Sequence, residues 1–309
     1  MGIAADAVRA SAGNDLPDND RQRPDHGPTD ARPGPAPAGP AAPGPAGPDP
    51  TRGLTELARR LRRAIVTQAG SPQGAHVGGS LSCADIIAVL YGAVLTESDT
   101  FVLSKGHAAP ALYAVLAETG RIDPAELATY ATAGSRLFGH PPRGLPGVPF
   151  PTGSLGHGLS LAAGLALAER LHGSRGRAYC LLGDGELQEG SSWEAAMFAG
   201  HQKLGNLVAI IDRNGLQITG PTEDCVGLEP LAGRFASFGW TARPVDGHDL
   251  DALRRSIEEP APGPVAVVAT TVKGRGVPFL EGKTSSHYAT LSPALVRRAM
   301  ASLDRGGVR

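Results

Sequence analysis

The residues with the clearest chemical potential follow two short apolar runs. Gly183, Asp184 and Gly185 come directly after the run "AYCLL", and Asn214 follows the next run, "LVAII". If both runs are parallel strands of one sheet, these residues lie at its carboxyl edge, where open α/β sheets bind ligands. Asp184 then offers a carboxylate, Asn214 an amide oxygen, and Leu216, in the next turn, a backbone carbonyl. Three such oxygens suit a small hard cation like Mg²⁺, which adds water and phosphate to its shell.

Each of these motifs alone has a simpler interpretation. A Gly-Asp-Gly segment is often a turn with an aspartate cap, and Asn214-Gly215 is a common turn pair. Their occurrence at successive strand ends favours one shared cation site over two unrelated turns. Gly185 supports this reading, because it lacks a Cβ and lets a diphosphate oxygen approach its backbone amide closely.

Four of the nine histidines lie in glycine-rich or small-residue segments. They are His76 in "GAHVGGS", His107 in "SKGHAAP", His140 in "FGHPPRGLPG" and His287 in "SSHYAT". A single histidine in a loop is usually a solvated side chain, but four in such settings favour a shared role. Imidazole has an unperturbed pKa of about 6.5 and two distinct nitrogens, so it can exchange protons with hydroxyl groups or hydrogen-bond an oxyanion near neutral pH.

The elements that must position these residues can be read from the apolar pattern. Residues 178–182, 207–211 and 264–272 are apolar on both alternating faces, which is typical of central parallel strands. Residues 188–205 have the length of a crossover helix between the first two strands. The sequence therefore predicts an α/β fold with a doubly wound, mostly parallel sheet.

Helices are expected on either side of these strands. An amphipathic pattern after the N-terminal tail predicts a first helix, which Gly70 and Pro72 end. Residues 82–95 are predicted to form a second helix that begins with a capping box of Ser82 and Asp85. Two further helices are expected at residues 107–120 and 159–173.

Composition divides the chain into two parts. Residues 1–51 contain "RPGPAPAGPAAPGPAGPDP", a stretch without the aromatic or branched aliphatic residues that a core needs. We expect a disordered tail there, with a polyproline docking segment as the alternative. Residues 52–309 are predicted to form one domain.

Bulk properties exclude several partners. The formal net charge is -1, from 29 basic and 30 acidic residues, which gives no reason to expect nucleic acid or a membrane as partner. No apolar stretch reaches the roughly 18 residues of a membrane span. The three cysteines form no CxxC pair, so neither a disulfide framework nor a zinc site is indicated. We therefore expect a soluble protein of the cytoplasm.

The pairing of Gly-Asp-Gly with a later asparagine resembles the signature of enzymes that bind thiamine diphosphate. The text "GDGELQEGSSWEAAMFAGHQKLGNLVAIIDRNGLQITG" is similar to the cofactor domain of transketolases, and specifically to the N-terminal subunit of the split enzymes. The resemblance covers about residues 57–291. It implies the thiamine diphosphate-binding fold, with residues 52–309 as the pyrophosphate-binding domain.

The resemblance also implies a cofactor site. Asp184, Asn214 and the Leu216 carbonyl would hold Mg²⁺, or Ca²⁺ or Mn²⁺ in its place. The residues expected to meet thiamine diphosphate itself are Gly185, the turn from Gly153 to Leu155, and Ile218, which would pack on the cofactor rings.

Catalytic roles follow from the same resemblance. His76 and His107 would address the C1 and C2 oxygens of the donor sugar, His140 the end of the donor, and His287 the hydroxyl of the acceptor or leaving group. Glu189 would reach the cofactor-activating glutamate of a neighbouring polypeptide.

Four other polar residues are treated as secondary. His157 stands where the family usually has glutamine, so it either tunes cofactor binding or is a tolerated polar substitution. Lys105 and Lys273 could anchor phosphate, but lysines in loops are usually solvated, and we expect the same of these two. Glu186 is expected to face solvent.

A transketolase also needs a pyrimidine-binding domain, which supplies the activating glutamate, and a C-terminal domain, which grips the sugar phosphate. The resemblance therefore implies a separately encoded C-terminal subunit in an α2β2 assembly that transfers a two-carbon ketol unit from a ketose phosphate to an aldose. A subunit of a 2-oxo-acid dehydrogenase or decarboxylase is one alternative, but its donor has no hydroxyls for the four histidines to address. A non-catalytic scaffold or regulatory remnant is the other.

Overall fold

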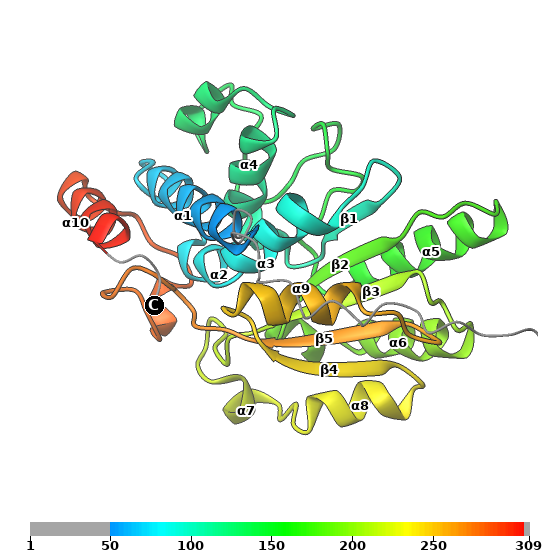
Figure 1. Ribbon diagram of the computed structural model, residues 1–309. Coiled ribbons are helices and arrows are strands. Elements are labelled where there is room, and N and C mark those ends of the chain that lie inside the picture. The colour runs from blue at the N-terminus through cyan, green and yellow to red at the C-terminus, as the bar shows by residue number, and fades with distance from the viewer. Residues whose placement is uncertain (1–49, 306–309) are drawn as a thin grey trace, which may run out of the picture. The chain divides into compact units, whose positions relative to one another are not determined.

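The computed structural model describes residues 50–305 (Figure 1). The predicted disordered tail, residues 1–51, lies outside the described residues except for its last two, which begin the first helix. No helix within residues 50–305 is long and apolar enough to cross a membrane. The cytoplasmic location stays a prediction.

A parallel sheet of five strands forms the centre of the described chain. The strands are β1 (Thr100–Leu103), β2 (Ala178–Gly183), β3 (Leu207–Arg213), β4 (Thr241–Asp246) and β5 (Val265–Thr270). Their order across the sheet is β1-β2-β3-β5-β4, and every neighbouring pair is parallel. The predicted strands are β2, β3 and β5, which lie side by side in the middle, so the predicted fold class is confirmed.

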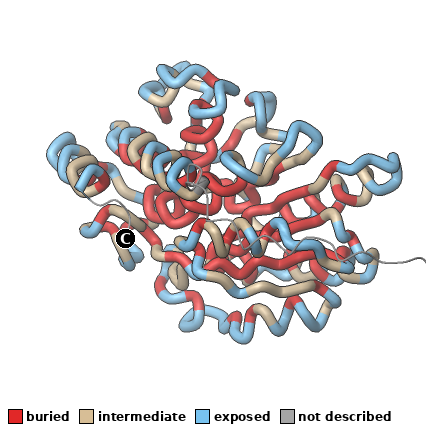
Figure 2. The backbone as a smooth tube through the Cα atoms, in the orientation of Figure 1, coloured by how far each residue is buried: buried red, intermediate tan, exposed pale blue. Residues whose placement is uncertain are grey.

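Helices cover both faces of this sheet, which buries its central strands (Figures 1 and 2). Along β2, Tyr179 and Leu181 belong to one apolar core, while Cys180 and Leu182 belong to the other. Successive side chains of a strand point to opposite faces. The run "AYCLL" is therefore apolar at every position because both of its faces are covered.

Two layers of helices form these cores with the sheet. The first layer contains α1 (Pro50–Ala69), α2 (Val77–Ser82), α3 (Ala84–Val89), α4 (Ala109–Glu118), α9 (Leu250–Glu258) and α10 (Pro293–Arg305). The second contains α5 (Gly158–Leu171), α6 (Gly190–His201) and α8 (Leu231–Ser237). The one-turn helix α7 (Thr222–Cys225) follows β3. The crossover helix predicted within residues 188–205 is α6.

The capping box predicted at the second helix is wrong. A break separates α2, which ends at Ser82, from α3, which begins at Ala84. The Ser82 hydroxyl donates to Asp212 (2.6 Å), and the Asp85 carboxylate accepts from Arg62. Both side chains are used in contacts with distant segments, and such contacts are not visible in a local pattern.

The two edge strands were not predicted from the sequence. Strand β1 is four residues long, and β4 reads "TARPVD" with side chains that are half-buried or exposed. An edge strand pairs on one side only, so it tolerates Pro244 and polar residues that a central strand would exclude. Neither strand has the continuous apolar run that identified β2, β3 and β5.

A buried ion pair fixes α1 to α3. Arg62 donates to both carboxylate oxygens of Asp85, at 2.9 and 2.6 Å. His248 Nδ1 lies 2.7 Å from Asp85 Oδ2, and His248 Nε2 accepts the Val272 amide at 2.9 Å, so the proton is on Nδ1. Burial alone would raise the pKa of Asp85, but Arg62 and His248 outweigh it and lower this pKa to about 2.

Replacing Asp85 with asparagine should lower the free energy of unfolding by about 3–5 kcal/mol, because the buried guanidinium of Arg62 loses its counter-charge. Urea unfolding followed by circular dichroism measures the loss. Arg136→Gln is the matched control, because it breaks an exposed two-bond pair with Glu126 and should change stability little. Equal losses in the two variants would contradict a special role for the buried pair.

Candidate functional site

A cavity of about 380 Å³ opens at the carboxyl ends of β2 and β3. It lies where the strand-end motifs were expected to meet. All the site residues singled out in the sequence line it: His76, His107, His140, Gly153, Leu155, Asp184, Gly185, Glu189, Asn214, Leu216, Ile218 and His287. The structure thus brings these residues together, while their individual roles stay predictions.

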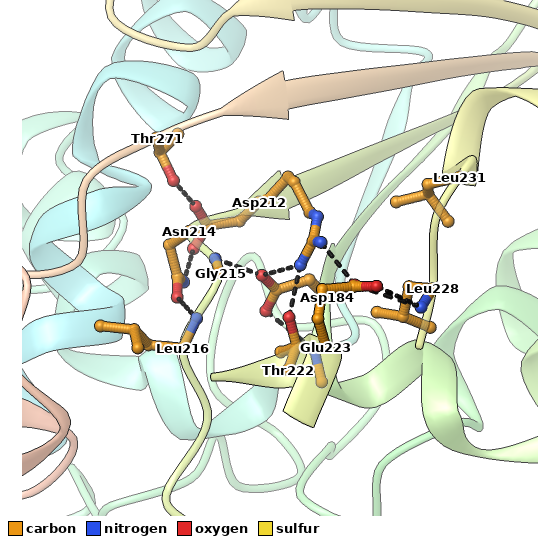
Figure 3. Close-up of polar contacts among 12 residues, drawn as sticks. Asp184, Asp212, Asn214, Gly215, Leu216, Thr222, Glu223, Leu228, Leu231 and Thr271 are labelled. Atoms are coloured by element: carbon orange, nitrogen blue, oxygen red, sulfur yellow. Dashed lines mark hydrogen bonds and ion pairs between the residues drawn. The ribbon is translucent and has the colours of Figure 1, made fainter. Parts of the chain in front are cut away.

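The three residues expected to supply oxygen ligands lie close together (Figure 3), and all three line the cavity. Asp184 is 2% exposed; its Oδ1 accepts the Gly185 amide (2.8 Å) and its Oδ2 the Gly215 amide (2.6 Å). Asn214 Oδ1 accepts the Leu216 amide at 3.1 Å. Asp184 Oδ1 and Asn214 Oδ1 keep acceptor capacity beyond these bonds, whereas Asp184 Oδ2 also accepts from Arg213 Nη1 at 3.2 Å. The donor set therefore fits a hard cation that takes carboxylate, amide and carbonyl oxygens.

Only one carboxylate belongs to this donor set. Accordingly, residues 50–305 contain no group of three or more His, Cys, Asp or Glu side chains that could hold a metal ion. The chemistry of the set suits Mg²⁺, which takes one or two carboxylates and completes its shell with phosphate and water.

Asp212, the residue before Arg213 at the end of β3, orients the proposed cation ligand Asn214. Its Oδ2 accepts Asn214 Nδ2 (3.2 Å), which fixes the amide so that Asn214 Oδ1 is the free acceptor. Ser82, Lys105 and Thr271 also donate to this carboxylate. Burial opposes both charges, yet Lys105 lowers the pKa of Asp212 and Asp212 raises that of Lys105, so both stay ionised.

The expectation that Lys105 is solvated was therefore wrong. Its side chain is 1% exposed, and Nζ also donates to the Gly79 carbonyl (2.9 Å). Asp212 was not predicted from the sequence at all. Its one signal was a charged residue at the end of an otherwise apolar strand, and such a residue needs a partner when it is buried.

Glu186 was expected to face solvent, and this is also wrong. It is 2% exposed and lies beside the Gly-Asp-Gly turn. Its carboxylate accepts hydrogen bonds from the Ser104 hydroxyl, the Gly156 amide (3.0 Å) and the Gly183 amide (3.1 Å). Glu186 thus connects the end of β1, the turn from Gly153 to Gly156 and the end of β2, which are three walls of the cavity.

A glycine allows the loop after β1 to reach the same turn. A Cβ on Gly106 would lie 2.7 Å from the Gly153 amide nitrogen, which is closer than real Cβ contacts. Gly106 directly precedes His107 and follows Lys105. Its missing side chain therefore lets the loop that carries His107 pack against the expected diphosphate turn.

The four histidines form one cluster. The ring centroid of His76 lies 5.5 Å from that of His107, 5.5 Å from that of His140 and 5.4 Å from that of His287. His107 and His287 stack at 5.3 Å. These residues come from four separate segments, which only the tertiary structure brings into contact.

Burial keeps these imidazoles neutral. Desolvation, aided by neighbouring histidines and by Lys273, lowers the pKa of His76 to about 4. Burial likewise lowers the pKa of His287 to about 4, that of His107 well below 6.5, and that of His140. At neutral pH each ring then has one nitrogen that donates and one that accepts, which suits contacts with sugar hydroxyls.

Lys273 links the cluster to the cation donors, although it was expected to be solvated. It is 2% exposed, and Nζ donates to the Leu216 carbonyl (2.8 Å) and lies 3.3 Å from His287 Nδ1. Burial lowers its pKa to about 8. Leu216 therefore already accepts one hydrogen bond from a cationic group, which leaves one lone pair for another ligand.

Two of the remaining residues lie at the rim of the cavity, and a third lies outside it. Glu189 is exposed at the start of α6 and makes no capping hydrogen bond. Ile218 is 67% exposed although it lines the cavity. His157 is exposed outside this cavity, with Nδ1 3.0 Å from the Leu155 carbonyl, so it contacts the expected diphosphate turn from the outer side.

His76 and His287 should each titrate with a midpoint near pH 4 in the folded chain, which ¹⁵N-detected NMR of the imidazoles measures. The unfolded state binds protons from about pH 6.5 downwards, so the free energy of unfolding should fall as pH drops from 6.5 to 4. The same histidines in urea-unfolded chain are the control and should titrate near pH 6.5. Midpoints near 6.5 in the folded chain would contradict the neutral cluster.

Comparison with known proteins agrees with this geometry. Residues 53–304 match the family model described as transketolase, thiamine diphosphate binding domain. One of the subunits of the apulose-4-phosphate transketolase of Actinobacillus succinogenes is 42% identical over 248 residues, which cover 76% of this chain and 90% of the relative. A 6-deoxy-6-sulfo-D-fructose transketolase subunit of a Clostridium species is 39% identical, covering 82% of this chain and 97% of the relative.

Solved structures show the same fold. The transketolase of Leishmania mexicana aligns with a TM-score of 0.77 at 28% identity, covering 83% of this chain. The alignment covers 42% of that longer chain, so this chain spans less than half of that transketolase. The chain therefore belongs to the transketolase family, as the thiamine diphosphate-binding domain of a transketolase-type transferase.

Proposed function

We propose that this chain is the cofactor-binding subunit of a two-subunit transketolase that moves a two-carbon ketol unit from a ketose to an aldose. One observation carries the proposal: four neutral imidazoles share a single cavity with a set of oxygen donors for a cation. A 2-oxo-acid donor has no hydroxyls for these imidazoles, and a scaffold does not require either group.

The cofactor end of the cavity would hold thiamine diphosphate through its phosphates. Asp184, Asn214 and the Leu216 carbonyl would bind Mg²⁺, while the Gly185 amide and the turn from Gly153 to Leu155 would meet the diphosphate. Ile218, at the rim, would contact the rings. When bound, thiamine diphosphate supplies the carbon nucleophile that breaks and forms the ketose carbon–carbon bond.

The histidines would act on the sugar. His76 and His107 would hydrogen-bond the C1 and C2 oxygens of the donor, and His140 the end of the donor. His287 would accept the proton of the hydroxyl whose carbon becomes the released aldehyde, and return it to the acceptor. Because the four rings are neutral at pH 7, each can accept a proton without first losing one.

The names of two relatives point to an anionic sugar. These relatives are named for apulose 4-phosphate and 6-deoxy-6-sulfo-D-fructose, sugars that bear a phosphate or a sulfonate. The cations that line the cavity are Lys105, which is paired with Asp212, and Lys273, and its acidic lining residues are Asp184, Glu186 and Glu189. We infer a ketose with an anionic end group as donor.

A partner polypeptide would complete the site. The relatives are named as transketolase subunits, and this chain spans 42% of a single-chain transketolase. Glu189 is exposed at the cavity rim, where it can reach a carboxylate of another polypeptide. We infer that a separately encoded C-terminal subunit joins this chain in an α2β2 assembly, with the cofactor between the two kinds of polypeptide.

Reconstitution tests this function. The chain purified with the product of the neighbouring reading frame should transfer ketol units from xylulose 5-phosphate or a sulfonated ketose to ribose 5-phosphate, and neither protein alone should do so. Product analysis by mass spectrometry measures transfer. Turnover of pyruvate without ketol transfer would support the 2-oxo-acid alternative, and no binding of thiamine diphosphate by the pair would support a scaffold.

Replacing Asp184 with alanine should abolish magnesium-dependent binding of thiamine diphosphate, because the cation loses its one carboxylate ligand. Calorimetric titration measures binding. Asp224→Ala removes an exposed carboxylate on the nearby helix α7 and should bind as the unmodified chain does. Magnesium-dependent binding that persists in Asp184→Ala would refute the assigned cation site.

A further inference from the structure

Arg213 places a fixed positive charge on the proposed cation site. It is the last residue of β3, and its Nη1 lies 3.2 Å from Asp184 Oδ2. Its side chain is 12% exposed. One of the three proposed cation ligands therefore already contacts a cation.

Residues 221–229 hold the guanidinium in this position. Nη1 donates to the Thr222 hydroxyl at 2.5 Å, Nη2 to Glu223 at 2.7 Å and Nε to Glu229 at 3.1 Å. The side chains of Asp184, Thr222 and Glu223, which all accept hydrogen bonds from this guanidinium, lie next to one another (Figure 3). Because the guanidinium bonds to four partners, moving it away from Asp184 would also break its bonds to Thr222, Glu223 and Glu229.

A second cation contacts the same donor set, because Lys273 donates to the Leu216 carbonyl at 2.8 Å. Against these two positive charges the set contributes one negative charge, on Asp184. Glu223 and Glu229 offset Arg213 only in part, because their side chains are 41% and 55% exposed and solvent screens them.

Asp184 does not need Arg213 for its orientation. The amides of Gly185 and Gly215 each donate to one of its oxygens, at 2.8 and 2.6 Å. These backbone bonds remain when the Arg213 side chain is changed. The main effect of Arg213 on the site is therefore its charge.

We propose that Arg213 keeps the site weak for a free divalent cation and makes cation binding depend on the diphosphate. The inference rests on the proposed cation site of Asp184, Asn214 and Leu216. A diphosphate carries negative charge and oxygen ligands, so it offsets Arg213 and Lys273 and completes the coordination shell. Cation and diphosphate then bind as a unit, and Arg213 acts through Asp184 without contacting substrate.

The test is a titration of the full-length chain with Mn²⁺ alone, followed by the EPR signal of free Mn²⁺. Arg213→Met should bind Mn²⁺ about tenfold more tightly than the unmodified chain, or more, because a charge of like sign beside the ligand is gone. Arg213→Lys keeps the charge and should bind as weakly as the unmodified chain. Thiamine diphosphate should raise the Mn²⁺ affinity of the unmodified chain more than it raises that of Arg213→Met.

Two further variants make the result decisive. In the Arg213→Met background, Asp184→Asn should remove the gained Mn²⁺ binding, and a gain that survives would place the cation elsewhere and overturn the proposal. Equal or weaker Mn²⁺ binding by Arg213→Met, in chain that circular dichroism shows to be folded, would overturn it too. If Arg213→Met fails to fold, Arg213→Gln, which keeps a donor toward Thr222 and Glu223, replaces it in the same comparison.

Failure of the proposed function would look different. Unmodified chain and partner that bind no thiamine diphosphate would refute the transketolase subunit. The comparison of Mn²⁺ affinities needs neither diphosphate nor partner, so it still decides the role of Arg213.

Discussion

Asp212, at the carboxyl end of β3, accepts hydrogen bonds from four different parts of the chain. Ser82 belongs to α2, which begins directly after His76. Lys105 lies two residues before His107, and Thr271 lies two residues before Lys273. The fourth donor, Asn214, is a proposed cation ligand. One buried carboxylate thus holds the segments of His76 and His107, the buried Lys105 and the proposed cation ligand Asn214 relative to one another.

This arrangement is stable only because the charges balance. Asp212 and Lys105 are both removed from water, which is costly for each alone, and their contact keeps both ionised. The cavity in front of them has a different character. Its imidazoles are neutral at pH 7, so each ring keeps one nitrogen that can accept a proton from a hydroxyl group.

The rim of the cavity is exposed to solvent, whereas the residues at its centre are buried. Glu189 and Ile218 lie at the edge of the cavity and are exposed, whereas Asp184, Glu186 and Lys273 at its centre are buried and hydrogen-bonded. This chain organises the centre of the cavity, and in the proposed assembly the partner subunit would cover the exposed rim.

The sequence by itself determined the central strands and the crossover helix, because each has a local signature, and the resemblance to the transketolase cofactor domain supplied the residues of the proposed site. Runs that are apolar on both faces mark β2, β3 and β5, and segments rich in glycine or other small residues mark the four histidines. Only the tertiary structure decided what surrounds these residues. Lys105, Glu186 and Lys273 looked like solvated loop residues, and Arg213 drew no attention, because their partners lie up to about a hundred residues away in the chain. Burial and pairing across such separations depend on how the segments fold together, and no local pattern of residue types records them.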